Sequence, residues 1–211
     1  IPDFHNTKKR LGTLFADAEK DITDRRAEVE EELDYIRSVR DEASALSIRF
    51  ANGEFPTRVT HNDTKANNVL FDPVTKRPII VIDLDTVMPG MAMYDFGDAV
   101  RSIASTAVKD EPELSKVFLD TEKFRAFAEG FIKEVKGVLT ADEIDSLVQA
   151  SFSVTVELAS RYLDDYLNGD TYFKCNYPAQ NLVRARCQLQ LSKDILRKKD
   201  ELQRMVRDVV E

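Results

Sequence analysis

The sequence predicts an α+β fold that is mostly helical, with one short β segment between helical regions. Apolar residues recur at steps of three and four over residues 15–50 and again from residue 94 onward, the spacing of amphipathic helices. Residues 57–86 instead carry short runs rich in valine and isoleucine, separated by turn residues, as strands do. A chain of 211 residues can bury a sizeable core and is long enough for one large domain or two small ones; we expect residues 1–211 to form a single domain.

The first helical region contains no glycine or proline and is rich in alanine, glutamate, arginine and leucine. We expect a break near Asp24 that divides residues 15–50 into two helices. The apolar stripe of this region consists of Leu33, Ile36, Val39 and Ala43. The following ANGEFP, at residues 51–56, ends the helix.

The β segment consists of the runs TRVTHND, NNVLFD and RPIIVIDLDT. The residues DPVTKRP between the last two favour a turn, so these two runs are expected to form a hairpin within one small sheet. The dipeptide Pro89–Gly90 is expected to end the sheet.

Four helical stretches follow the β segment. The first starts at Tyr94, and the second, TEKFRAFAEGFIKEVKGVL, carries an apolar stripe of phenylalanines. Thr140 and Glu143 have the spacing of a capping box, which would start a long helix ending at Asn168–Gly169. The last helix is expected to have Pro178 in its first turn.

Composition narrows the classes of partner. The formal net charge of −8 disfavours nucleic acid and anionic membrane as partners, and no apolar run approaches the length of a membrane span. The first residues lack the apolar core of a signal peptide. Cys175 and Cys187 are expected to be free thiols in a reducing cytoplasm, with a bridge inside one helical hairpin as the alternative.

The most informative motif is HNDTKANN at residues 61–68, which fits the pattern H-x-D-x-x-x-x-N of a phosphoryl-transfer catalytic loop. In that pattern Asp63 orients the attacking hydroxyl and accepts its proton. Asn68 offers an amide oxygen to Mg²⁺, a cation that prefers hard oxygen ligands. The alternative is an ordinary acidic turn in which the same residues cap loops.

A second acid is expected to complete the metal site. Asp83 follows the apolar strand PIIVI directly, and the hairpin would bring it to the same end as Asn68. Carboxylates gathered without a cation would repel one another, so their convergence favours a divalent ion. The run Asp83-Leu84-Asp85 differs from the D-F-G of protein kinases, and no A-P-E follows, which argues against a protein substrate.

The stretches THNDTKANNVLFD, VIDLDTV and YDFGDAVR resemble the aminoglycoside phosphotransferase and choline kinase superfamily, and most of all its sugar 1-kinases of the N-acetylhexosamine kinase type. The resemblance implies the C-terminal lobe of the protein-kinase-like fold, with a short β-hairpin beside the catalytic loop. It also implies that Asp63 is the catalytic base and that Asn68 and Asp83 hold Mg²⁺. His61 and Asp95 would brace the loop, although Asp95 could instead cap a helix beginning near Phe96.

Two further residues near the motif have open roles. Lys65 lies two positions after Asp63 and can face the same cleft, where it would neutralise the transferred phosphoryl group or bond the acceptor; it could also be a solvated loop lysine. Asp85 could orient the Mg²⁺ ligands or cap a turn.

The acceptor site is expected in RYLDDYLNGDTYFK, residues 161–174, which combines an arginine, several acids and two aromatic residues. Resemblance to the N-acetylhexosamine kinases implies that Arg161 and Tyr172 bind the sugar together with Asp63, Lys65 and Asp83. The alternatives are a surface ion pair of Arg161 with Asp164 or Asp165 and a core position for Tyr172.

The expected function is therefore ATP- and Mg²⁺-dependent phosphorylation of the anomeric hydroxyl of an N-acetylhexosamine or related sugar. The rivals are a kinase of another small metabolite (choline, homoserine or an aminoglycoside) and a non-catalytic helical module or pseudokinase. No glycine-rich phosphate loop precedes residue 57, since Gly12 and Gly53 lie far apart. We therefore expect the nucleotide-binding N-terminal lobe to be a partner outside this chain, and the chain alone to be inactive.

Overall fold

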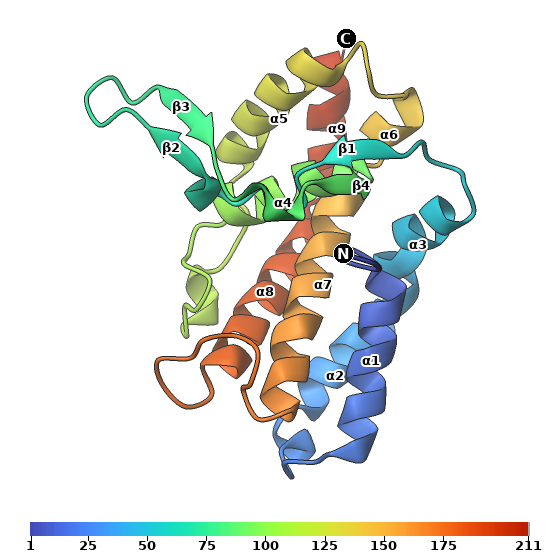
Figure 1. Cartoon of the computed structure of the whole chain (residues 1–211), viewed down its shortest axis with the longest axis vertical. Coiled ribbons are helices and arrows are strands. Elements are labelled where there is room, and N and C mark those ends of the chain that lie inside the picture. The colour runs from blue at the N-terminus through green and yellow to red at the C-terminus, as the bar shows by residue number, and fades with distance from the viewer. Residues whose placement is uncertain (211) are drawn as a thin grey trace.

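A computed structural model describes residues 1–210, in which one β-hairpin projects from a helical body (Figure 1). Within this range the helices are α1 (Thr7–Lys20), α2 (Glu30–Ser38), α3 (Arg40–Ala51), α4 (Ala92–Ile103), α5 (Thr121–Val135), α6 (Ala141–Asp145), α7 (Leu147–Leu167), α8 (Gln180–Arg197) and α9 (Lys199–Val210). The strands are β1 (Arg58–Thr60), β2 (Val69–Phe71), β3 (Pro78–Val81) and β4 (Met88–Gly90). The prediction of a mostly helical α+β fold is confirmed. None of these helices has the length and hydropathy that crossing a bilayer requires.

The core forms around α7, which runs through the middle of the body and packs against α8, α4, α1 and α3 (Figure 1). Nearly every residue of α7 is buried, so other elements surround this helix on most sides. The contact with α4 is close because Gly97 has no side chain: a Cβ there would lie 2.7 Å from the backbone of Ala150. This approach sets the position of α4, whose first turn carries Asp95.

The predicted hairpin is present, but the β segment forms two separate two-stranded sheets. β2 and β3 are antiparallel, with Val69 opposite Val81. β1 pairs instead with β4, where Arg58 lies opposite Gly90. Pro89 and Gly90 therefore belong to the last strand, and the β region ends at Gly90 as predicted. Short 3₁₀ turns at Ala66–Asn68 and Leu84–Thr86 redirect the chain between the two ladders.

Several helix boundaries differ from the prediction. The first helix begins at Thr7 rather than near residue 15, because the side chain of Asn6 accepts a hydrogen bond from the Lys9 N–H and caps it. The predicted break near Asp24 is confirmed. It is followed by a further division at Val39, between α2 and α3.

The two long C-terminal helices are also divided. At Ser146 the backbone N–H is shared between two preceding carbonyls and the hydroxyl bonds to the Asp142 carbonyl, which separates α6 from α7. The last region divides at Lys198, whose ammonium turns to the Leu119 carbonyl at 2.6 Å. It begins at Gln180, after Ala179 in a left-handed conformation.

Three local predictions are confirmed. Thr140 and Glu143 form the capping box in both directions. α7 ends with Asn168 as its C-cap, and Gly169, with φ of 87°, follows as the stop signal. Cys175 and Cys187 are free thiols.

Candidate active site

Hydrogen bonds to Asp95 of α4 hold the loop at residues 61–68 in place. The Asp95 carboxylate accepts hydrogen bonds from the backbone N–H of His61 (2.8 Å) and of Asn62 (2.7 Å), and the Asp95 carbonyl accepts one from the Thr64 hydroxyl (2.6 Å). Burial raises the pKa of the Asp95 carboxyl, although the two N–H donors act in the opposite direction. Because α4 begins at Ala92, Asp95 lies within the first turn and does not cap the helix.

A second set of bonds joins the loop to the segment that follows β3. The Thr86 hydroxyl donates to the His61 carbonyl at 2.7 Å, and the Asn62 amide donates to the Thr86 carbonyl at 3.0 Å. The His61 ring lies 3.3 Å from the Ile82 carbonyl and accepts a bond from the Asp63 N–H. The two segments are therefore held together by polar bonds around His61.

The hairpin register brings Asn68 beside Asp83. The Ile82 N–H donates to the Asn68 carbonyl at 2.9 Å, which extends the β2–β3 ladder by one step and places Asp83 immediately after the paired residue. Asp83 has φ of 63°. Such a conformation is costly for a residue with a side chain and is frequent at functional sites.

Asp63, Lys65, Asn68 and Asp83 lie together. The Lys65 ammonium contacts the Asp63 carboxylate at 2.5 Å and the Asp83 carboxylate at 3.5 Å. The Asn68 amide N–H₂ donates to the backbone carbonyl of Asp63 (2.9 Å) and to its carboxylate (3.1 Å). Lys65 therefore lies between two acids, each of which remains partly open to solvent.

The charges around Lys65 act in opposite directions. Partial burial disfavours its charged form, but Asp63 and Asp83 outweigh that effect and raise the pKa of the Lys65 ammonium. The lysine thus offsets the negative charge of both carboxylates.

The donor atoms suit a magnesium ion. In residues 1–210 no three His, Cys, Asp or Glu side chains gather as metal ligands. A carboxylate from Asp83 and an amide oxygen from Asn68 nevertheless form the hard oxygen pair that Mg²⁺ uses beside nucleotide phosphates. Asp85 is exposed, and in the described part of the chain its carboxylate forms no hydrogen bond or ion pair.

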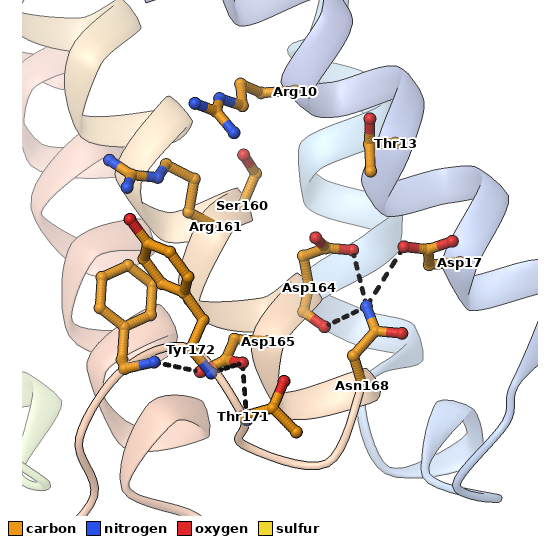
Figure 2. A pocket seen from close by; sticks show the side chains of 11 residues that line it. Arg10, Thr13, Asp17, Ser160, Arg161, Asp164, Asp165, Asn168, Thr171 and Tyr172 are labelled. Carbon is orange, nitrogen blue, oxygen red and sulfur yellow. Dashed lines mark hydrogen bonds between the residues drawn. The ribbon is translucent and has the colours of Figure 1, made fainter. Parts of the chain in front are cut away.

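A separate cavity of about 510 Å³ lies between α1 and α7 and is closed at one end by the loop after α7 (Figure 2). Arg161 and Tyr172 both line it. The Arg161 guanidinium lies over the Tyr172 ring, 5.9 Å from its centre, and over the Phe173 ring at 5.5 Å. Arg161 has no ion pair with a described residue, and Tyr172 is 73% exposed, so neither the ion-pair nor the core alternative is found.

The opposite wall of the cavity is acidic. The Asn168 amide donates to both Asp17 and Asp164, which lie on α1 and α7 (Figure 2). Burial and the nearby Asp17 carboxylate raise the pKa of Asp164 to about 6. The cavity therefore offers cationic groups, Arg10 and Arg161, at one side and carboxyl groups at the other.

The loop that carries Tyr172 is held by Asp165. This buried carboxylate accepts hydrogen bonds from the backbone N–H of Thr171 (2.9 Å), Tyr172 (2.8 Å) and Phe173 (2.9 Å). It also accepts one from the Asn181 amide at 2.7 Å. Sequence reasoning gave Asp165 no such role, because an acid on a helix beside a second acid resembles ordinary surface charge.

The cavity and the catalytic loop are linked through the N-terminal segment. The Phe4 ring lies 5.8 Å from the Arg161 guanidinium, and the next residue, His5, contacts the Asn62 carbonyl at 3.0 Å. Asp63 itself does not line the cavity. Sequence reasoning did not identify His5, since no short-range motif contains it.

A model of the phosphotransferase enzyme family matches residues 2–127, more than half of the chain. The chain belongs to the phosphotransferase enzyme family. The match confirms the resemblance to aminoglycoside phosphotransferases and choline kinases at the level of the superfamily. Membership indicates a kinase-type enzyme that acts on small molecules with ATP as co-substrate, typically with Mg²⁺. The matched range contains the 61–68 loop, Asp83 and Asp95, and it ends before Arg161 and Tyr172.

Proposed function

We propose that this phosphotransferase transfers the γ-phosphoryl group of ATP to the anomeric hydroxyl of an N-acetylhexosamine or a related sugar. The observation that carries the proposal is the gathering of Asp63, Lys65, Asn68 and Asp83 at the base of one hairpin. Each has the side chain that its step in phosphoryl transfer requires.

In the proposed reaction Asp63 accepts the proton of the sugar hydroxyl while that oxygen bonds to the γ-phosphorus, and ADP leaves with the electron pair of the broken P–O bond. Lys65 offsets the charge of the transferred group. Asn68 and Asp83 would hold Mg²⁺, which neutralises phosphate charge when bound. His61 and Asp95 keep the loop in position through their backbone contacts.

The cavity supports a sugar as the acceptor. Its volume lies in the range of small-molecule sites, and it combines an aromatic wall from Tyr172 with polar groups. Arg161, free of acidic partners among the described residues, would bond ring hydroxyls or the acetamido carbonyl of the sugar.

The acidic wall favours a second candidate, an acceptor that carries an amino group, such as an amino alcohol or an aminoglycoside. Asp17 and Asp164 would pair with an ammonium group of that ligand. A panel of sugars and amines, with ADP release as the readout, separates the two candidates.

We also propose that an N-terminal nucleotide-binding lobe packs on the β2–β3 hairpin. Support comes from the apolar side chains that the hairpin exposes, namely Leu70, Phe71, Val74, Ile79, Ile80, Val81 and Ile82. With half of the nucleotide site in that lobe, the 211-residue chain should bind ATP poorly. Micromolar ATP affinity of this chain by calorimetry would contradict the proposal.

Substitutions in the full-length kinase, meaning this chain together with the proposed nucleotide-binding lobe, test the chemistry. Asp63→Asn and Asp83→Asn should each lower kcat by about 100-fold or more, since each removes a group that acts on the transferred phosphoryl. Arg161→Ala should raise the KM for the sugar far more than the KM for ATP. Asp200→Asn, at an exposed acid on α9, is the matched control and should change none of these values. Full activity of Asp63→Asn would refute the proposed mechanism.

A further inference from the structure

His5 connects the catalytic loop to the buried helix α7. Its Nδ1 lies 2.8 Å from Oε1 of Glu157, and its Nε2 lies 3.0 Å from the carbonyl oxygen of Asn62. The side chains of His5 and Glu157 are 13% and 1% exposed. The other Glu157 oxygen accepts a hydrogen bond from the Thr7 hydroxyl at 2.7 Å. The imidazole therefore has few conformations open to it.

Both partners of the imidazole are acceptors. A backbone carbonyl can only accept, and an ionised carboxylate can only accept, so both ring nitrogens must donate. A neutral imidazole has one N–H and would satisfy one partner only. The ring thus carries two protons and a positive charge when Glu157 is ionised.

The charges that face His5 favour this state. Burial alone lowers the pKa of the His5 imidazole, but the Glu157 carboxylate on α7, the Asn62 carbonyl and Asp98 together outweigh it, and the net shift is upward. Asp95 and Asp98 on α4 add negative charge nearby. The Tyr94 ring stands edge-on to the imidazole at 5.4 Å and excludes water from that side.

The bond from His5 completes the fixation of Asn62. This residue has φ of 64°, its N–H donates to Asp95, and its side chain bonds to the Thr60 and Thr86 carbonyls. Its carbonyl is the remaining polar group, and this group contacts His5. That carbonyl is part of the peptide group that joins Asn62 to Asp63. The orientation of this peptide group therefore sets the position of the Asp63 Cα and the direction of its side chain.

We propose that His5 is a positioning residue for phosphoryl transfer, which holds the Asn62–Asp63 peptide so that the Asp63 carboxylate meets the acceptor hydroxyl. The inference rests on the proposed function, in which Asp63 accepts that proton. A displacement of about 1 Å at a reacting group can cost roughly 100-fold in rate. His5 itself touches neither substrate nor phosphate.

Because His5 can donate to both Glu157 and the Asn62 carbonyl only while its imidazole is doubly protonated, turnover should depend on pH. The pKa of His5 is raised in the folded protein, so its contribution to stability is fully present below the unfolded value of about 6.5 and is lost as pH rises through the folded value. Turnover should fall over that upper range, because loss of the proton breaks one of the two bonds. A Glu157→Gln change removes the main upward influence and should move this fall to lower pH.

Kinetics of the full-length kinase give the first test. His5→Phe keeps an aromatic ring and removes both N–H donors; it should lower kcat by about tenfold to 100-fold, with the KM values for ATP and acceptor changed by less than about twofold. The fall of kcat at high pH should vanish in this variant. Asn6→Ala is the matched control, since it removes the cap of α1 at the neighbouring position. It should lower Tm and leave kcat unchanged.

Nuclear magnetic resonance of the 211-residue chain gives a test that needs no variant. The chain has only two histidines, so ring resonances are readily assigned. Both His5 nitrogens should carry protons at pH 7, and the Asp63 amide resonance should shift with the pH titration of His5. A singly protonated His5 at pH 7, or an Asp63 amide that ignores its titration, would overturn the proposal even if His5→Phe does not fold. Failure of the proposed function looks different, because Asp63→Asn would then remain active.

Discussion

Replacement of Asp165 by asparagine should release the loop at residues 168–179 from α7. One carboxylate oxygen accepts from the Thr171 and Tyr172 N–H groups, and the other accepts from the Phe173 N–H and the Asn181 amide. An asparagine amide has one oxygen and one N–H₂ group. In either orientation of the asparagine amide, its N–H₂ group would face the two donors that one carboxylate oxygen of Asp165 now accepts from. The two hydrogen bonds on that side are lost.

The size of the effect follows from those two bonds. Leaving a buried donor without a partner costs about 1–3 kcal/mol, so two such donors cost about 2–6 kcal/mol. The cost applies to the closed state of the loop rather than to the whole fold. Opening of the loop should therefore become roughly 30-fold more frequent or more.

Hydrogen exchange of the backbone amides in the 211-residue chain measures this opening directly. The amides of residues 171–173 should exchange at least about 30-fold faster in Asp165→Asn than in the wild type. Asp164→Asn is the matched control: it is the adjacent acid on α7, and its carboxylate bonds to Asn168 but to no backbone N–H of these residues. Exchange rates in Asp165→Asn within twofold of the wild type would refute the reasoning. In the proposed full-length kinase the same variant should raise the acceptor KM through Tyr172.

Three further changes test the fold around the site by thermal or denaturant unfolding. Gly97→Ala should destabilise the chain by about 1–3 kcal/mol, because the new Cβ would lie 2.7 Å from the Ala150 backbone; an unchanged Tm would mean that α4 shifts without cost. Thr140→Ala should cost about 1 kcal/mol through loss of the helix cap, and a larger loss would indicate a second role for the hydroxyl. Burial and Asp17 raise the pKa of Asp164 to about 6, so the contribution of Asp164 to stability is present below about pH 4 and is lost as pH rises through 6. Asp164→Asn should therefore make the free energy of unfolding depend less on pH over that range, and an unchanged slope would contradict this.

The gathering of Asp63, Asn68 and Asp83 in space was predictable from the sequence because the constraints on it are local. Asp63 and Asn68 lie five positions apart on one turn, and the turn between the two strands sets the register that brings Asp83 next to Asn68. Such relations depend on strand geometry and turn residues, both of which are visible in a short window of sequence.

Other features depend on contacts that no short window contains. The Glu157 partner of His5 is 152 positions away, and the Asn181 partner of Asp165 is 16 positions away. The helix division at Ser146 involves neither glycine nor proline, so no breaker residue marks it. Packing decides these features, and amino-acid propensity alone carries little information about them.

The exposed β2–β3 hairpin also bears on how the isolated chain behaves in solution. A two-stranded sheet leaves the outer N–H and C=O groups of both strands unpaired, and the run PIIVI at residues 78–82 carries no charge. An uncharged apolar edge of this kind is a template for strand addition by another chain. Pairing of hairpins between molecules should thus limit the solubility of the chain. Ile79 is 64% exposed, so Ile79→Lys should raise the concentration at which aggregates form without disturbing the helical core.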